Sequence, residues 1–109
     1  MTVNELCKAC DFTPVVEVNM DNPVSSAYAC DLLSWVIGRA RFNAALVTVM
    51  TNVNVIAVAS MADLSCVILS EGVKLDENAI QKAEENGIAV LSSKVDTYKT
   101  CALISKVLN

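Results

Sequence analysis

Apolar residues recur along the chain in short blocks whose spacing alternates between that of helices and that of strands. The first block predicts a short amphipathic helix over 3–10, and Thr2 with Glu5 forms a capping box in front of it. The apolar residues that follow one another at helical intervals are Val3, Leu6, Cys7 and Cys10. The β-branched run Val15–Val18 then predicts a strand.

The next stretch begins polar and then turns apolar. Asp21–Ala27 predicts a loop, because it combines an Asn-Pro step with paired serines. Tyr28–Ala40 is dense in apolar side chains and predicts a buried helix, with Asp31 near its start, where a negative charge suits the helix dipole. Ala44–Met50 is apolar at nearly every position, as in a central strand of a parallel sheet.

The segment Val53–Leu64 fits two structures. Its β-branched residues favour a strand, whereas its length and its alanine-containing tail favour a helix. A helix would also let the strand at 44–50 and the apolar strand Cys66–Leu69 run parallel, because parallel strands need a long crossover connection.

The C-terminal third has the clearest signals. Asp76 and Gly87 mark the ends of one helix, Ile88–Leu91 predicts a strand, and Asp96 or Thr97 caps a last helix. This alternation predicts an α/β fold: a three-layer α/β/α arrangement with a mostly parallel sheet of four to five strands and a leading N-terminal helix. We expect one domain over residues 1–109, since the chain has only 109 residues.

Composition narrows the possible functions. The net charge of −4 argues against binding a phosphate backbone, so we expect no nucleic-acid partner. The chain has no histidine, which excludes histidine-based catalytic triads and histidine zinc ligands. No other catalytic group stands out, so we expect a non-enzyme without a cofactor. Hydrophobic residues make up 54% of the chain, which is much for a small monomer to bury and predicts a homodimer.

The chain also lacks signals for export or membrane insertion. Its N-terminus has no basic region followed by an apolar one, and polar residues interrupt the most apolar region, Ala44–Leu69. Five cysteines, an odd number, are typical of reduced thiols rather than of a disulfide framework. We therefore expect a cytoplasmic protein with no membrane partner.

Cys7 and Cys10 form a C-x-x-C pattern that allows two interpretations. Sulfurs one helical turn apart could be a redox pair or half of a metal site. The same two positions lie on the apolar stripe of the first helix, where free cysteines are commonly buried. The remaining cysteines are scattered along the chain, so we expect Cys7 and Cys10 to be structural and no metal to be bound.

A second candidate site follows from the carboxyl ends of the predicted strands, where open parallel sheets bind ligands. Hydroxyls, an amide, a lysine and a helix N-terminus there could hold a phosphate or carboxylate group. The same residue types also serve as caps and turns, Asp96 opposes an anion, and no glycine-rich phosphate loop is present. The candidate ligand residues are Thr51, Asn52, Ser70, Ser92, Ser93, Lys94, Asp96 and Thr97.

Three segments together resemble the DRTGG domain family. Asp21–Tyr28 followed by Asp31–Ser34 resembles its signature, which runs roughly D-R-x-V-x-G-G-Y and then D-L-L-S. Val55–Ser60 and Gly87–Tyr98 resemble later stretches of the same family. The signature is altered here, since Asn22 replaces the arginine and Ser26-Ala27 replaces the glycine pair.

The resemblance implies a function class rather than a reaction. DRTGG domains occur in bacterial proteins, as the N-terminal part of HPr kinase-like proteins and beside CBS domains in regulated pyrophosphatases, as regulatory or assembly modules that tend to dimerise. The leading hypothesis is therefore a homo-oligomeric regulatory or protein-interaction module. The alternatives are a sensor of a nucleotide or another phosphorylated ligand, and a thiol redox or metal-binding protein that uses Cys7 and Cys10.

Overall fold

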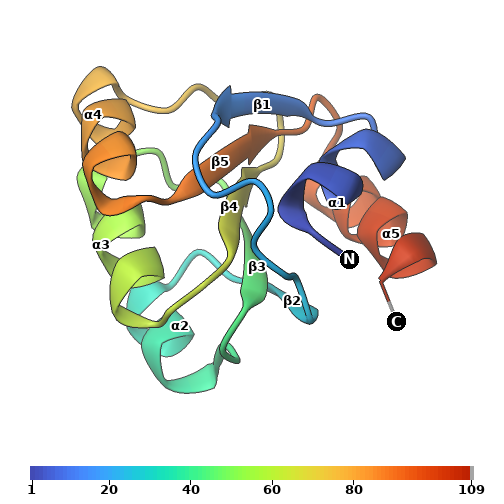
Figure 1. Ribbon diagram of the computed structural model, residues 1–109, viewed down its shortest axis with the longest axis horizontal. Coiled ribbons are helices and arrows are strands. Elements are labelled where there is room, and N and C mark those ends of the chain that lie inside the picture. The colour runs from blue at the N-terminus through green and yellow to red at the C-terminus, as the bar shows by residue number, and fades with distance from the viewer. Residues whose placement is uncertain (109) are drawn as a thin grey trace.

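One five-stranded sheet lies between two layers of helices in the computed structural model, which describes residues 1–108 (Figure 1). The helices are α1 (Val3–Ala9), α2 (Leu33–Arg39), α3 (Val53–Met61), α4 (Glu77–Asn86) and α5 (Thr97–Val107). The strands are β1 (Thr13–Val16), β2 (Ser26–Ala29), β3 (Ala44–Thr48), β4 (Cys66–Leu69) and β5 (Ala89–Ser92).

The strand order is β1-β5-β4-β3-β2. The strands β2, β3, β4 and β5 are parallel and follow one another across the sheet in chain order, and β1 is antiparallel to β5. The expected mostly parallel sheet, its leading helix and its three-layer α/β/α arrangement are confirmed. The helix interpretation of Val53–Leu64 is confirmed as well, because α3 provides the crossover between β3 and β4.

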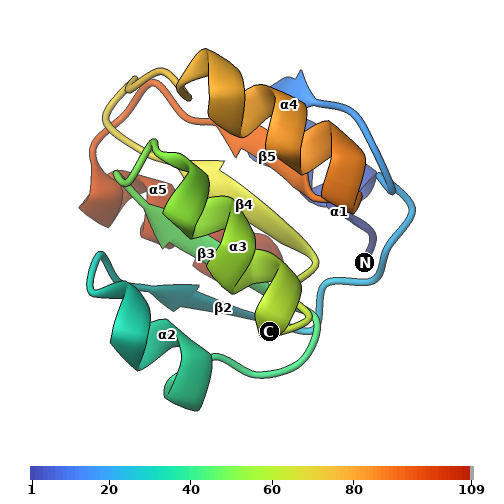
Figure 2. The same cartoon turned by 90° about the vertical axis from the view of Figure 1, so that its left-hand side faces the viewer.

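The two faces of the sheet are covered by different numbers of helices. Figure 2 shows α2, α3 and α4 side by side on one face, with α1 and α5 behind the sheet. Connections between adjacent parallel strands are right-handed. When each new strand is added on the same side of the previous one, all the connecting helices therefore lie on one face of the sheet. Of the helices within residues 1–108, α1 and α5 remain for the opposite face.

Burial follows this layering. Every residue of β3 and β4 is buried. Leu46, Val67 and Val90 belong to the core beneath α2, α3 and α4. Val47 and Ile68 point to the opposite face, where they belong to one core cluster with Leu6 of α1 and Ile104 of α5.

The strand β2 corrects two predictions. The expected loop at Asp21–Ala27 ends inside a strand, and the expected helix at Tyr28–Ala40 begins only at Leu33. Pairing with β3 explains the difference: Cys30 N donates to Val47 O at 3.1 Å, and the register pairs Tyr28 with Leu46. Tertiary pairing thus makes a strand from serine and alanine, which have little strand preference of their own.

Two smaller expectations also change. Asp31 does not cap α2, whose N-cap residue is Leu32 without a side-chain hydrogen bond. Asp31 Oδ1 instead accepts from Thr48 Oγ1 at 2.8 Å and from Val49 N at 3.0 Å, which holds the end of β2 against β3. The strand expected at Val15–Val18 lies two residues earlier, as β1, and forms the antiparallel border of the sheet.

The C-terminus of α4 depends on a glycine, as the sequence predicts. Gly87 has φ +69°, a left-handed conformation, and its carbonyl accepts from Asn19 Nδ2 at 2.9 Å. A Cβ atom at this position would lie 2.7 Å from Asn19 Nδ2. Both the backbone conformation and the contact with Asn19 therefore select glycine.

We predict that Gly87→Ala lowers the free energy of unfolding by about 1–3 kcal/mol, since it combines left-handed strain with a steric clash. Urea unfolding followed by circular dichroism measures the change. The control is Gly38→Ala in α2, where a Cβ atom meets nothing within 4 Å. This control should raise stability by roughly 0.5–1 kcal/mol, because alanine is the better helix former. Equal effects of the two substitutions would contradict the prediction.

Candidate functional site

The predicted ligand residues follow three parallel strands at one edge of the sheet. Thr51 and Asn52 come after β3, Ser70 comes after β4, and residues 92–97 end β5 and lead into α5. The chain leaves β4 toward α4 on one face and leaves β5 toward α5 on the other. Adjacent loops that diverge in this way form the crevice where open α/β sheets bind ligands.

In this chain, backbone hydrogen bonds join the two diverging loops across that crevice. Glu71 N donates to Val95 O at 2.8 Å, and Gly72 N donates to Ser93 O at 2.9 Å. Ser93 N in turn donates to Leu69 O at 2.7 Å. These bonds extend the pairing of β4 and β5 past the ends of the strands and occupy backbone donors that a ligand would need.

Three of the hydroxyls predicted to contact a ligand are hydrogen-bonded to other hydroxyls of the chain instead. Ser70 Oγ and Thr97 Oγ1 are 2.7 Å apart, and Ser93 Oγ and Thr100 Oγ1 are 2.8 Å apart. Ser70, Ser93 and Thr100 are buried. Buried hydroxyls need such partners, so these pairs account for the residue types without a ligand.

A carboxylate of the chain itself lies at the N-terminus of α5. Glu71 Oε2 accepts from Thr97 N at 2.8 Å and from Thr97 Oγ1 at 3.3 Å. Asp96 Oδ1 accepts from Lys99 N at 2.8 Å, as expected of a helix cap. The helix N-terminus, where an anion would be held, therefore already has two negative groups beside it.

Sequence reasoning missed Glu71. Its backbone is left-handed, with φ +65°, and Gly72 follows at φ +67°. The only sequence signal was an acidic residue before a glycine directly after a buried strand, a pattern that is common in turns. The contact with Thr97 depends on tertiary structure, because the two residues are 26 positions apart.

The other predicted residues have local roles or are free at the surface. Asn52 Oδ1 accepts from Asn54 N at 2.9 Å and caps α3. Thr51 O accepts from Asp76 N at 3.0 Å, which ties the start of α4 to the end of β3. Lys94 is exposed and, with Ser93, lines a hollow of about 360 Å³ beside the start of β1.

Cys7 and Cys10 lie on the buried side of α1. Each has 4% of its surface exposed, and Cys7 Sγ donates to Phe12 O at 3.2 Å. Burial raises the pKa of both thiols, and for Cys7 the charges of Glu17 and Asp11 add to this effect. A raised pKa disfavours the thiolate, which is the form that reacts and that binds metals. The geometry therefore supports the structural interpretation.

Residues 1–108 show neither a metal-binding cluster nor a membrane-spanning helix. No group of three or more histidine, cysteine, aspartate or glutamate residues in this range is placed to hold a metal ion. No helix in the same range is long and apolar enough to cross a membrane.

A groove of about 310 Å³ runs between β2 and α5, on the face of the sheet that α1 and α5 cover. Its floor includes Ala27 and Ala29, which are exposed, and Val47 of the neighbouring strand. Cys101 and Ile104 of α5 form part of its wall. The sequence did not indicate this groove, because the strand that forms its floor was expected to be a loop and the start of a helix.

Comparison with known proteins gives a family and a fold. The DRTGG domain model matches residues 31–107, which begin just after the segment 21–28 that resembles the signature. No curated protein matches the chain. A solved structure of the CBS and DRTGG domains of the regulatory region of Clostridium perfringens pyrophosphatase, complexed with the activator diadenosine tetraphosphate, matches with a TM-score of 0.77 at 13% identity. The match covers 98% of this chain and 47% of the pyrophosphatase chain. The present chain therefore spans about half the length of that structure's chain.

Cys66 provides a pH-dependent test of the core. Burial raises the pKa of this thiol to about 12 from an ordinary value of 9.0. Above pH 9 the unfolded chain loses the proton that the folded chain keeps, so the free energy of unfolding falls as pH rises toward 12. We predict that this group contributes a fall of about 1.4 kcal/mol per pH unit between those values.

The measurement is urea unfolding at several pH values between 8 and 11, compared with Cys66→Ala, which removes the thiol. The variant is less stable at pH 8 because of the cavity, but its stability should fall less steeply with pH. The same slope in both proteins would contradict the prediction.

Proposed function

This chain belongs to the DRTGG domain family, and we propose on that basis that it is a cytoplasmic, non-enzymatic regulatory or protein-interaction module that works as a homo-oligomer. The main observation behind this proposal is that no helix within residues 1–108 covers the outer strand β2 on the groove side of the sheet. Strands of a parallel sheet are ordinarily covered on both faces, yet Ala27 and Ala29 are exposed beside the groove. A partner that covers this region would complete the α/β/α arrangement.

Two further observations support an assembly function. Leu32 and Trp35, which follow β2 along the chain, are 53% and 49% exposed, so exposed apolar side chains are not confined to the groove. The Arg39 guanidinium lies 3.9 Å from the centre of the Trp35 ring. The structurally similar region of the Clostridium perfringens pyrophosphatase is a regulatory one. Large exposed apolar surfaces on small domains mark interfaces.

We predict that sedimentation equilibrium at micromolar concentration shows a dimer, with twice the chain mass of 11.6 kDa. Dilution toward the nanomolar range should shift the distribution toward the monomer, as expected of a reversible interface. A single species at the mass of one chain throughout the micromolar range would contradict the homo-oligomer.

A second candidate function is the sensing of a nucleotide or another phosphorylated compound. The observation that favours it is the complex of the similar regulatory region with diadenosine tetraphosphate. We propose that such an anion would bind at the N-terminus of α5, beside Lys94 and the hydroxyls of Ser92, Ser93 and Thr97, with Ser70, Thr51 and Asn52 on the neighbouring strand ends. Asp96 and Glu71 oppose it, so binding requires the Glu71 carboxylate to leave Thr97 N.

This competition gives a prediction for the ligand site. Removing the charge in Glu71→Gln should tighten the binding of inorganic phosphate, AMP or ATP by about tenfold, because a competing carboxylate is removed from the helix N-terminus. Amide chemical-shift titrations of both proteins measure the affinity and locate the site. The control is Glu84→Gln on the exposed side of α4. Shifts on another surface, or no saturable shift in either protein, would contradict this site.

A further inference from the structure

The two borders of the sheet differ in how they are protected against pairing with another strand. β1 contains Pro14, which has no N–H to offer, and Glu17 follows shortly after it. In contrast, residues 25–30 of the β2 border contain neither a proline nor a charged residue. Exposed strand borders usually carry such residues because an unprotected border accepts a further strand.

The backbone of β2 is oriented for that addition. Cys30 N donates to Val47 O, so in the alternating pattern of a strand the amides of Ala27 and Ala29 point away from β3. No described strand lies on that side, because β2 ends the sheet order. The side chains of Ala27 and Ala29 project onto the face that bears the groove, so they do not stand between this border and another backbone.

Exposed apolar side chains lie on both sides of this border. α2 lies beside β2 at the same border of the molecule (Figure 2). Leu32 just before α2 and Trp35 within it are exposed, and the Arg39 guanidinium lies 3.9 Å from the centre of the Trp35 ring. On the other face lies the groove between β2 and α5. A partner at this border therefore covers apolar surface on both sides of the sheet while it adds a strand.

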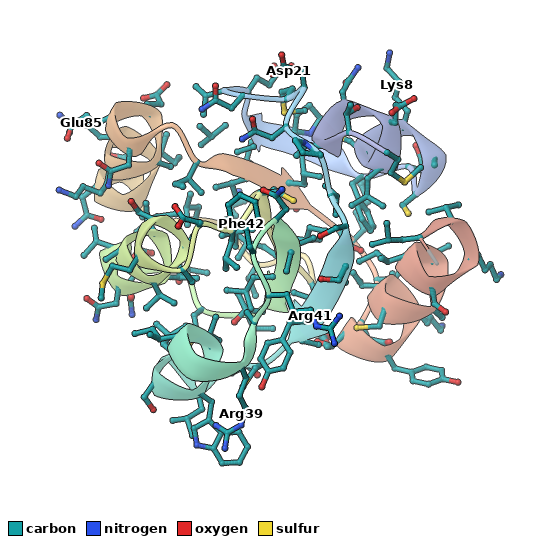
Figure 3. All side chains as sticks on the ribbon, turned by 60° about the horizontal axis from the view of Figure 1, so that its bottom comes forward. Lys8, Asp21, Arg39, Arg41, Phe42 and Glu85 are labelled. Atoms are coloured by element: carbon teal, nitrogen blue, oxygen red, sulfur yellow. The ribbon has the colours of Figure 1, made fainter. Side chains whose placement is uncertain are left out.

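Charges at the two ends of β2 indicate which partner fits. Arg41 lies near the amino end, since Arg41 O accepts from Ala44 N, and Asn43 O accepts from Ser25 N (Figure 3). Asp31 follows the carboxyl end of the strand. Its Oδ1 is held by Thr48 Oγ1 and Val49 N, and its Oδ2 has no hydrogen bond among the described residues. An antiparallel copy of β2 reverses this order, so Arg41 of each copy lies toward Asp31 of the other. The uncharged centre also lets two chains with a net charge of −4 each meet without repulsion there.

We infer that β2 pairs antiparallel with β2 of a second copy around a two-fold axis, which joins the two sheets into one. This interface rests on the homo-oligomer proposed above and names the surface that forms it. A two-fold interface requires a patch that is complementary to itself, and this strand with its oppositely charged ends meets that requirement.

The test is the double substitution Ala27→Glu and Ala29→Glu, studied by sedimentation equilibrium. Antiparallel pairing would place carboxylates of the two copies opposite each other, which destabilises a strand pair. We expect the dimer dissociation constant to rise by at least about tenfold. The matched control is Thr13→Glu, an exposed position on the opposite border strand β1, which should leave the constant unchanged.

Amide hydrogen exchange of the unaltered protein provides a measurement that does not depend on the variant folding. The amides of Ala27 and Ala29 should exchange more slowly as the dimer forms with rising concentration. A dimer whose Ala27 and Ala29 amides exchange equally fast at all concentrations, or one broken by Thr13→Glu instead, would overturn the β2 interface but not the homo-oligomer. A monomer at all concentrations would overturn both.

Discussion

The order in which the parallel strands are added determines the rest of this structure. Because β2, β3, β4 and β5 lie side by side in chain order, right-handed crossovers place α2, α3 and α4 on one face. A helix is about 10 Å wide and strands are about 4.8 Å apart, so one helix covers about two strands. Three helices suffice for five strands, whereas α1 and α5 alone leave one border strand uncovered. The exposure of β2 is thus a consequence of topology.

The carboxyl ends of β3, β4 and β5 offer little to a ligand. Divergence of the chain after β4 and β5 would open a crevice, but each loop there donates to or accepts from the other. Glu71 supplies the negative charge that the N-terminus of α5 favours. The chain therefore satisfies internally the groups that bind anions in related architectures, and a ligand has to compete with a contact that is already made.

Much of the fold could be predicted because local and tertiary preferences agree. The caps at Asp96 and Gly87, and the apolar strands β3 and β4, carry their signals within a few residues. β2 carries no such signal. Its Ser-Ala-Tyr-Ala sequence becomes a strand because its backbone pairs with that of β3. The predicted ligand residues follow strands at the carboxyl edge of the sheet, as the sequence indicated, but the Glu71 contact at the N-terminus of α5 joins residues far apart in sequence.

The segment Asp21–Tyr28, which resembles the family signature, follows β1 and includes the start of β2. Its backbone ties the N-terminus in place: Asn22 O accepts from Val3 N at 3.0 Å, and Val24 N donates to Met1 O at 2.8 Å. These are main-chain bonds, so they do not depend on the arginine that Asn22 replaces. In the resemblance to the family signature, Ser26 and Ala27 take the place of two glycines. Residues 25–30 include no proline and no charged side chain, so the backbone of β2 stays open to another strand at this border.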